Sequence, residues 1–234
     1  MKADAQDHGL SPAPALSNRA VALEGAGAFV LALMIVAAGI LAERHALHDA
    51  EFIVPVVAMA GAYSFIALAA LFGAEARCLF NPAVAFARVL GGTLPLAAGL
   101  TCAAAQIMGA MIGVMAAHFA TGTGLVQNAS LAQTGPVVWL GEAAATAAVV
   151  FAVIFLERRG RYIAAFVATA ILFIAAAVTP SLSFANPALT LARGLTESFT
   201  SIALADAVII ALIQLAAAGI AVLALRYQRK SDQF

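Results

Sequence analysis

The sequence predicts an all-α membrane protein in which six transmembrane helices and two re-entrant half-helices form an inverted repeat of three plus three spans. Three observations support this fold class. The 234 residues are 64% hydrophobic and only 10% charged, with a mean hydropathy of +1.00, whereas a soluble domain carries about 25% charged residues. Six apolar runs are long enough to cross a bilayer, and one ten-residue motif occurs twice. The formal net charge is zero, which gives no reason to expect a nucleic-acid partner.

The six predicted spans are rich in Ala, Val, Ile and Leu, and their lengths are near the roughly 20 residues that a transmembrane helix needs. They cover residues 20–42, 52–73, 95–118, 137–156, 162–178 and 206–226. We expect a single membrane domain over 20–228, with inverted halves at about 20–118 and 137–226 and polar tails at 1–19 and 229–234.

Basic residues indicate the orientation of these spans. The loop at 119–136 contains no Lys or Arg. Basic residues occur instead before the first span, between the fourth and fifth, and at the end of the chain, at Lys2, Arg19, Arg158, Arg159, Arg161, Arg226, Arg229 and Lys230. Because cytoplasmic loops carry an excess of Lys and Arg, we expect both termini in the cytoplasm and a multi-pass protein of the inner or plasma membrane.

An internal repeat relates the two halves. Residues 81–90 read NPAVAFARVL and residues 186–195 read NPALTLARGL, with six identities in ten positions. Further pairs match outside the motif, namely Glu24 with Glu142 and Gln106 with Gln214. Three spans in each half is an odd number, so the second half is inserted upside down, as in membrane transport folds built from inverted repeats.

The two Asn-Pro segments, at about 80–91 and 185–197, are too short to span a membrane. Asn is a preferred N-cap and Pro is favoured at the first helical position, so Asn81-Pro82 and Asn186-Pro187 each predict the start of a half-helix. Backbone groups cannot stay unsatisfied in lipid, so both segments must fold back into the protein. Their N-termini then meet near the midplane, where two positive dipole ends repel cations and the Asn amides donate to a neutral solute.

The chain resembles the major intrinsic proteins, the family of aquaporins and aquaglyceroporins. The resemblance rests on the two motifs, Asn81-Pro82-Ala83 and Asn186-Pro187-Ala188, and on the paired Glu and Gln residues. It implies a homotetramer with one pore in each subunit. Buried carboxylates in a membrane are usually functional, and one interpretation of Glu24 and Glu142 is proton relay. The resemblance implies the other, that each Glu holds its neighbouring re-entrant loop. Gln106 and Gln214 either line the pore or, as their small-residue neighbours indicate, form hydrogen bonds from helix to loop.

The resemblance also implies an outer selectivity filter, which is predicted to depart from the family pattern. Its four positions correspond to Gly61, Ile174, Ser183 and Leu189. The aromatic residue and the Arg typical of a water-selective member are replaced by Gly61 and Leu189, which predicts a wider and more apolar constriction. A second motif without an adjacent Arg is similar to a bacterial subgroup associated with arsenite and related metalloid acids.

Two arginines occupy equivalent positions in the repeat, Arg88 and Arg193. Both are predicted to carry positive charge at the mouths of the pore. Arg193 either repels cations at the outer mouth or pairs with Glu197, which lies four residues further along the chain. Arg77, shortly before the first motif, is a candidate to project into the cytoplasmic half of the pore.

The function predicted from these features is a passive channel for small uncharged solutes, with glycerol-like polyols or metalloid acids such as arsenite passing together with water. A water-selective aquaporin is the alternative, and a secondary transporter of inverted repeats is a further one. No catalytic motif, metal site or cofactor is expected, so the protein is not predicted to be an enzyme. Its expected partners are the lipid bilayer and small neutral solutes.

Overall fold

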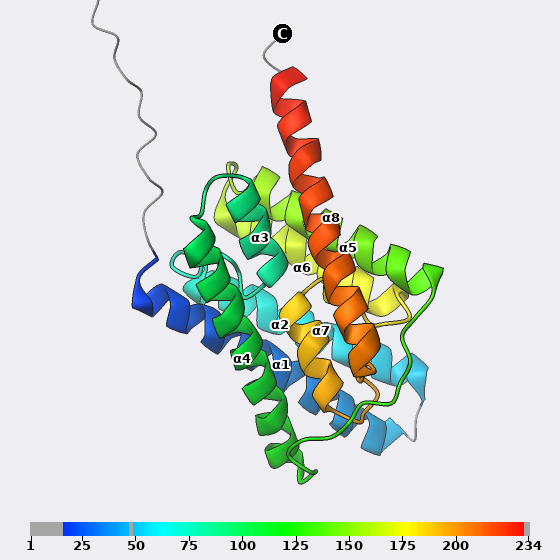
Figure 1. Ribbon diagram of the computed structural model, residues 1–234. Coiled ribbons are helices and arrows are strands. Elements are labelled where there is room, and N and C mark those ends of the chain that lie inside the picture. The colour runs from blue at the N-terminus through cyan, green and yellow to red at the C-terminus, as the bar shows by residue number, and fades with distance from the viewer. Residues whose placement is uncertain (1–15, 47–48, 232–234) are drawn as a thin grey trace, which may run out of the picture.

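The computed structural model describes residues 16–46 and 49–231, and over these ranges it contains helices and no strand (Figure 1). Six helices are long and apolar enough to cross a membrane. They are α1 (Asn18–Ala46), α2 (Ala50–Phe72), α4 (Leu96–Thr121), α5 (Pro136–Leu156), α6 (Arg161–Val178) and α8 (Leu204–Ser231). The six predicted spans are confirmed. Residues 1–15 and 232–234 of the predicted tails lie outside the described ranges.

Two short helices follow the Asn-Pro motifs. Helix α3 (Pro82–Leu90) comes from the side of the bundle on which α8 ends, and α7 (Pro187–Ala192) comes from the opposite side (Figure 1). A 3-10 turn, η1 (Arg193–Leu195), continues α7. The prediction of two half-helices that enter from opposite faces is confirmed, and the second is shorter than the segment 185–197 predicted for it.

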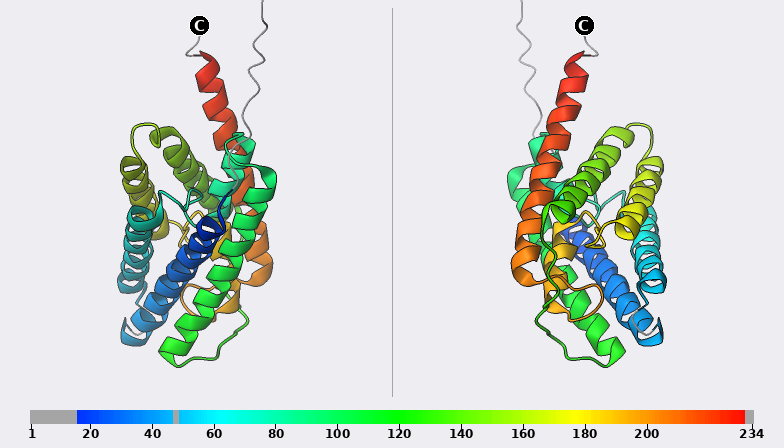
Figure 2. Two further views of the ribbon diagram at one scale, coloured as in Figure 1. Left: turned by 90° about the vertical axis from the view of Figure 1, so that its left-hand side faces the viewer. Right: turned by 90° about the vertical axis from the view of Figure 1, so that its right-hand side faces the viewer.

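The packing of the helices repeats in the two halves. Helix α1 packs on α2 and α4 in the first half, as α5 packs on α6 and α8 in the second. Each half-helix lies between α4 and α8, and α2 crosses to contact α6 (Figure 2). The half-helices are therefore held inside the bundle, where their backbone ends are kept away from lipid.

Small residues allow the closest approach, which is between α1 and α4. A β-carbon at Gly109 would lie 2.1 Å from the backbone oxygen of Gly25, and one at Gly113 would lie 2.3 Å from that of Phe29. Any larger residue would push the two helices apart. Close packing of this kind is how helices associate in a membrane, where the hydrophobic effect does not drive them together.

The outer surface of the bundle is apolar, whereas polar side chains gather inside it. Exposed large apolar residues occur on the long helices, for example Leu71, Leu100, Phe119, Leu140 and Leu212. The buried polar side chains include Glu24, Asn81, Arg88, Gln106, Glu142, Asn186, Arg193 and Gln214. The fold thus gathers these buried polar side chains around the two half-helices.

Candidate pore and its supporting network

The two Asn residues meet where the half-helices begin. Asn81 caps α3, with its Oδ1 accepting from the backbone N–H of Ala83 at 2.9 Å, and Asn186 caps α7 in the same way through the N–H of Ala188 at 3.0 Å. Each amide also crosses the junction. Asn81 Nδ2 donates to the carbonyl of Ala185 at 2.8 Å, and Asn186 Nδ2 donates to the carbonyl of Phe80 at 3.0 Å. These reciprocal bonds join the two half-helices at their N-termini.

The residue before each Asn adopts a left-handed backbone conformation. Phe80 has φ of 60° and Ala185 has φ of 50°, although neither is glycine. A non-glycine residue in this region costs about 1–3 kcal/mol. Both residues supply the carbonyl that accepts from the opposite Asn, so the reciprocal bonds depend on this conformation.

Glu24 holds the loop that leads into α3. Its Oε1 accepts from the backbone N–H of Cys78 at 2.6 Å, and its Oε2 accepts from the N–H of Phe80 at 2.8 Å and from Gln106 Nε2 at 2.8 Å. The carboxylate therefore replaces water as the partner of two loop N–H groups. This geometry agrees with the loop-holding role that the family resemblance implies.

Glu142 holds the second loop through hydroxyl groups instead of backbone N–H groups. Ser181 Oγ and Ser183 Oγ each donate to its carboxylate at 2.6 Å, and Gln214 Nε2 donates to it at 2.8 Å. Ser183 Oγ in turn accepts from the backbone N–H of Ala185 at 3.2 Å. Ser181 was not identified from the sequence, although a serine pair close to the second motif is the signal that could have indicated it.

The two glutamines differ in how completely they are paired. Gln214 also bonds to the hydroxyl of Thr190, with Nε2 at 3.0 Å from Oγ1. In the other half the position equivalent to Thr190 is Ala85, which has no hydroxyl, and Gln106 Oε1 is buried without a partner among the described residues. Gln106 is therefore the less completely paired of the two glutamines.

Arg88 and Arg193 hold the same loops from the far end of each half-helix. Arg88 Nε donates to the carbonyl of Arg77 at 2.7 Å, and Arg193 Nη1 donates to the carbonyl of Leu182 at 3.1 Å. Both acceptors lie four residues before the motif Asn. Arg88 also forms an ion pair with Glu157 at 2.9 Å.

The contacts of Arg193 and Glu197 bear on one of the two interpretations of Arg193, its pairing with Glu197. The carboxylate of Glu197 accepts from Ser130 Oγ at 2.6 Å and from the Ser130 N–H at 2.7 Å. Arg193 is instead buried and donates to backbone carbonyls, including that of Ser181 at 2.7 Å. The pairing alternative is therefore not found, because the guanidinium turns inward to the loop before Asn186 while Glu197 turns to the loop segment at Ser130.

Three of the four predicted filter positions lie inside the bundle. Gly61, Ser183 and Leu189 are buried, whereas Ile174 is 56% exposed on the outer face of α6. Its neighbours Leu172 and Ala175 form the inward face. The placement of the fourth filter residue at Ile174 is therefore corrected, since residue 174 points away from the half-helices.

The space expected beside Gly61 is occupied. A β-carbon on Gly61 would lie 2.2 Å from Cε1 of Phe184, so the Phe184 ring takes the place of a side chain at position 61. Gly61 by itself therefore does not widen the constriction at this point, because an aromatic ring from the loop before Asn186 fills the space beside it. Only the folded structure brings these two residues together, across more than a hundred positions of sequence.

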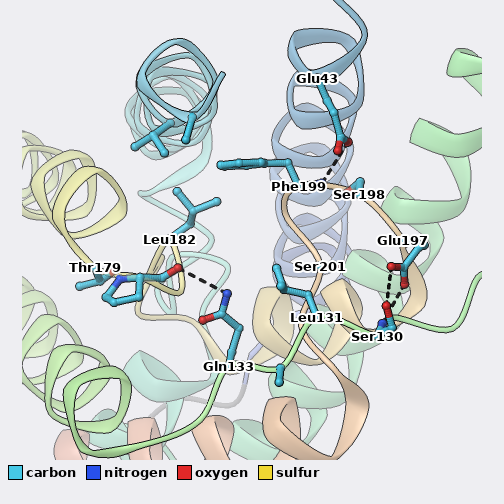
Figure 3. A pocket seen from close by; sticks show the side chains of 14 residues that line it. Glu43, Ser130, Leu131, Gln133, Thr179, Leu182, Glu197, Ser198, Phe199 and Ser201 are labelled. Carbon is cyan, nitrogen blue, oxygen red and sulfur yellow. Dashed lines mark hydrogen bonds between the residues drawn. The ribbon is translucent and has the colours of Figure 1, made fainter. Parts of the chain in front are cut away.

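The two ends of the junction differ in size and charge. On the α7 side a cavity of about 780 Å³ has a mixed lining, in which apolar residues alternate with the carboxylates of Glu43 and Glu197 and with hydroxyl groups such as those of Ser130 and Ser198 (Figure 3). On the side where α8 ends, a cavity of only about 20 Å³ is lined by Arg77, Arg88, Glu157 and Arg161. Arg77, predicted to project toward this half, does line it.

Two half-helices that face one another across a buried polar junction, inside a six-helix bundle with an apolar surface, define a membrane channel for small solutes. No family model matches the chain. A search of curated proteins finds aquaglyceroporin AqpS of Rhizobium meliloti (strain 1021), which is 31% identical over 187 residues, covering 80% of this chain and 79% of that protein. The chain therefore belongs to the major intrinsic protein family, as its motifs predicted.

Proposed function

We propose that this channel carries small uncharged solutes larger than water, with glycerol-like polyols or undissociated metalloid acids such as arsenite passing together with water. The observation that carries the proposal is Leu189. This residue directly follows the second Asn-Pro-Ala motif, where a water-selective member has Arg, and its side chain is buried and apolar. A Leu offers no hydrogen bonds to replace those that water loses, so water has less advantage over bulkier neutral solutes.

The similarity to a protein named as an aquaglyceroporin supports the same proposal. Transport by this route needs no chemical step. The junction offers amide donors from Asn81 and Asn186, each of which has a second N–H beyond the one that crosses the junction. A hydroxyl oxygen of a polyol or of an undissociated acid is a suitable acceptor for them.

We also propose the orientation of the protein, from the positions of its Lys and Arg residues, and its assembly, from its family membership. The protein lies in an inner or plasma membrane with both termini on the cytoplasmic side. In this orientation the large cavity opens to the outside and the small basic cavity lies on the cytoplasmic side. Four copies assemble, each with its own pore, and a native mass measurement in mild detergent should give four times 23.7 kDa. A mass of one or two copies would contradict the tetramer and leave the pore unaffected.

A swelling panel in proteoliposomes tests the proposed solute class. Purified protein is exposed in turn to gradients of water, glycerol, urea and arsenite, and the rates are compared with those of protein-free vesicles. We expect glycerol or arsenite to permeate at rates comparable with that of water, and the flux to rise linearly with the gradient. Flux of water alone would support the water-selective alternative, and a flux that saturates would support a carrier.

A further inference from the structure

We infer that Phe184 is the residue that sets the size limit of this channel, and that Gly61 is small because the Phe184 ring needs its place. The inference rests on the proposed function, because it names the side chain that limits which solutes pass. Phe184 takes over the role that the family pattern assigns to the filter residues at positions 61 and 183.

The first observation is the contact between Phe184 and Gly61. Three ring atoms of Phe184 lie within 3.0 Å of the position that a β-carbon at residue 61 would occupy. Real β-carbons do not approach other heavy atoms so closely, so any larger residue at 61 requires the ring to move. Gly61 lies on the buried face of α2, between Val57 and Phe65, so the ring projects from the loop into the interior where a filter side chain on α2 would project.

The second observation is that the neighbouring residue in the loop is turned elsewhere. Ser183, the expected filter residue, donates its hydroxyl to Glu142 at 2.6 Å, and its backbone N–H donates to Thr179 Oγ1 at 2.8 Å. It is completely buried. Ser183 is thus used to hold the loop, which leaves Phe184 as the large side chain that this loop directs to α2.

The third observation is that Phe184 is held in its position. The guanidinium carbon of Arg193 lies 5.9 Å from the centre of the Phe184 ring, within the range of a cation–π contact. The same guanidinium donates to the carbonyls of Ser181 and Leu182, which precede the ring in the chain. Arg193 is therefore a positioning residue, which fixes both the loop and the ring that the loop carries.

The consequence is a change in where the aromatic wall of the filter comes from. A ring on a transmembrane helix is replaced by a ring on the re-entrant loop, and the glycine that replaced the first ring makes room for the second. Phe184 and Leu189 together form an apolar boundary on the approach to Asn186. Such a boundary limits solutes by size and not by charge.

The test compares the permeability of glycerol and of the longer polyol xylitol with that of water, in proteoliposomes of each variant. Phe184→Ala should raise the ratio of xylitol to water permeability by about tenfold, which corresponds to about 1.4 kcal/mol in barrier height. Phe166→Ala is the matched control, since Phe166 is 64% exposed on the outer face of α6 and the same ring is removed from a lipid-facing site. It should leave the ratio unchanged.

A swap of the two side chains separates a filter role from a purely structural one. Gly61→Phe alone places two rings in one space and should reduce all fluxes. The double variant Gly61→Phe with Phe184→Gly returns the ring to α2 and should restore the wild-type xylitol-to-water ratio. If the Phe184 ring serves only to pack the loop, a ring on α2 cannot substitute for it. A double variant with the same raised xylitol-to-water ratio as Phe184→Ala therefore overturns the inference.

Failure of the Phe184 inference can be told apart from failure of the proposed solute class. A wild type that passes only water contradicts the proposed solute class, yet a gain of glycerol flux in Phe184→Ala would still support the role of Phe184. Conversely, an unchanged ratio in a well-folded Phe184→Ala overturns the inference and leaves the channel's solute class intact. Should the Ala variant elute as an aggregate, Phe184→Leu provides the same comparison with a smaller loss of packing, and an unchanged ratio there has the same meaning.

Discussion

Equivalent residues of the two halves carry different side chains, and these differences decide which hydrogen bonds each half can make. Three residues before the Asn, Cys78 in the first half corresponds to Ser183 in the second. The Cys78 backbone donates to Glu24, whereas at the second site the Ser183 hydroxyl donates to Glu142. Glu24 and Glu142 therefore hold equivalent loops, the first through backbone N–H groups and the second through serine hydroxyl groups.

Leu189→Arg is the informative change for solute preference. Arg would add a bulky planar cation with five N–H donors at the position where the proposed filter is apolar. We expect it to reduce glycerol or arsenite flux more than water flux in a proteoliposome swelling assay. Leu189→Met serves as the control, since it keeps the size and the apolar character. An unchanged solute-to-water ratio in the Arg variant would contradict the proposed role of Leu189.

Glu142→Ala should destabilise the protein, because it leaves two serine hydroxyls and the Gln214 amide without their buried acceptor. The expected loss is at least about 2 kcal/mol, seen as a lower midpoint of thermal unfolding in detergent. Glu197→Ala also removes a carboxylate with two hydrogen bonds, but these bonds to Ser130 are exposed to water, which can replace them, so the midpoint should fall much less. A proton relay would give the opposite pattern, with proton flux lost in Glu142→Gln while stability is kept.

Ala85→Ser should stabilise the protein. The added hydroxyl copies Thr190, which bonds to Gln214 in the second half, and it can donate to the unpaired Gln106 Oε1. One such bond contributes about 1 kcal/mol, measurable as a higher unfolding midpoint. Ala87→Ser, at another buried alanine of α3, is the control and should give no gain. Equal midpoints for both variants would show that the orphaned oxygen is not reached from position 85.

At the scale of elements, the half-helices depend on one another. Each Asn caps its own helix and donates to the loop that precedes the other helix. The strained backbone at Phe80 and Ala185 is offset by these bonds, and the arginine at the end of each half-helix returns to the loop four residues ahead of the Asn. In each half the arginine thus ties the end of the half-helix to the loop before it, and the two Asn residues join the halves to one another.

Asn186→Ala should damage both half-helices and not only α7. It removes the cap of α7, at a cost of about 1 kcal/mol, and also the bond to the Phe80 carbonyl in the other half. We expect lower flux of every solute and a lower unfolding midpoint. Asn128→Ala, in an exposed loop, is the control. Full flux in Asn186→Ala would contradict the role of the junction.

At the scale of the molecule, the channel combines a wide cavity with two carboxylates at one end, a narrow cavity with three arginines at the other, and two helix N-termini between them. The apolar outer surface and the interlocked long helices hold these parts in place. A charged solute in the pore meets the N-termini of α3 and α7, and each of these dipole ends is equivalent to about half a positive charge.

The protein should exclude ions even though position 189 carries no Arg. A cation at the junction meets two positive dipole ends, and an anion would have to give up its water to an apolar boundary at Leu189. Purified protein in a planar bilayer should therefore give no proton or sodium current above that of the lipid alone. A gramicidin-containing bilayer shows that such a current would be detected, and a measurable current through the protein would refute exclusion.

The sequence by itself determined the six spans, the two half-helices, their inverted arrangement and the residues that cap them, because these depend on runs of apolar residues and on local Asn-Pro chemistry. It also indicated the paired Glu and Gln residues, since the repeat placed them at matching positions. The tertiary structure alone decided what lies beside Gly61, where Ile174 points and what Arg193 binds. Those outcomes depend on contacts that the local sequence does not specify. The ring of Phe184 reaches a helix more than a hundred residues away, and a shift of about two residues, half a helical turn, reverses the face that residue 174 presents.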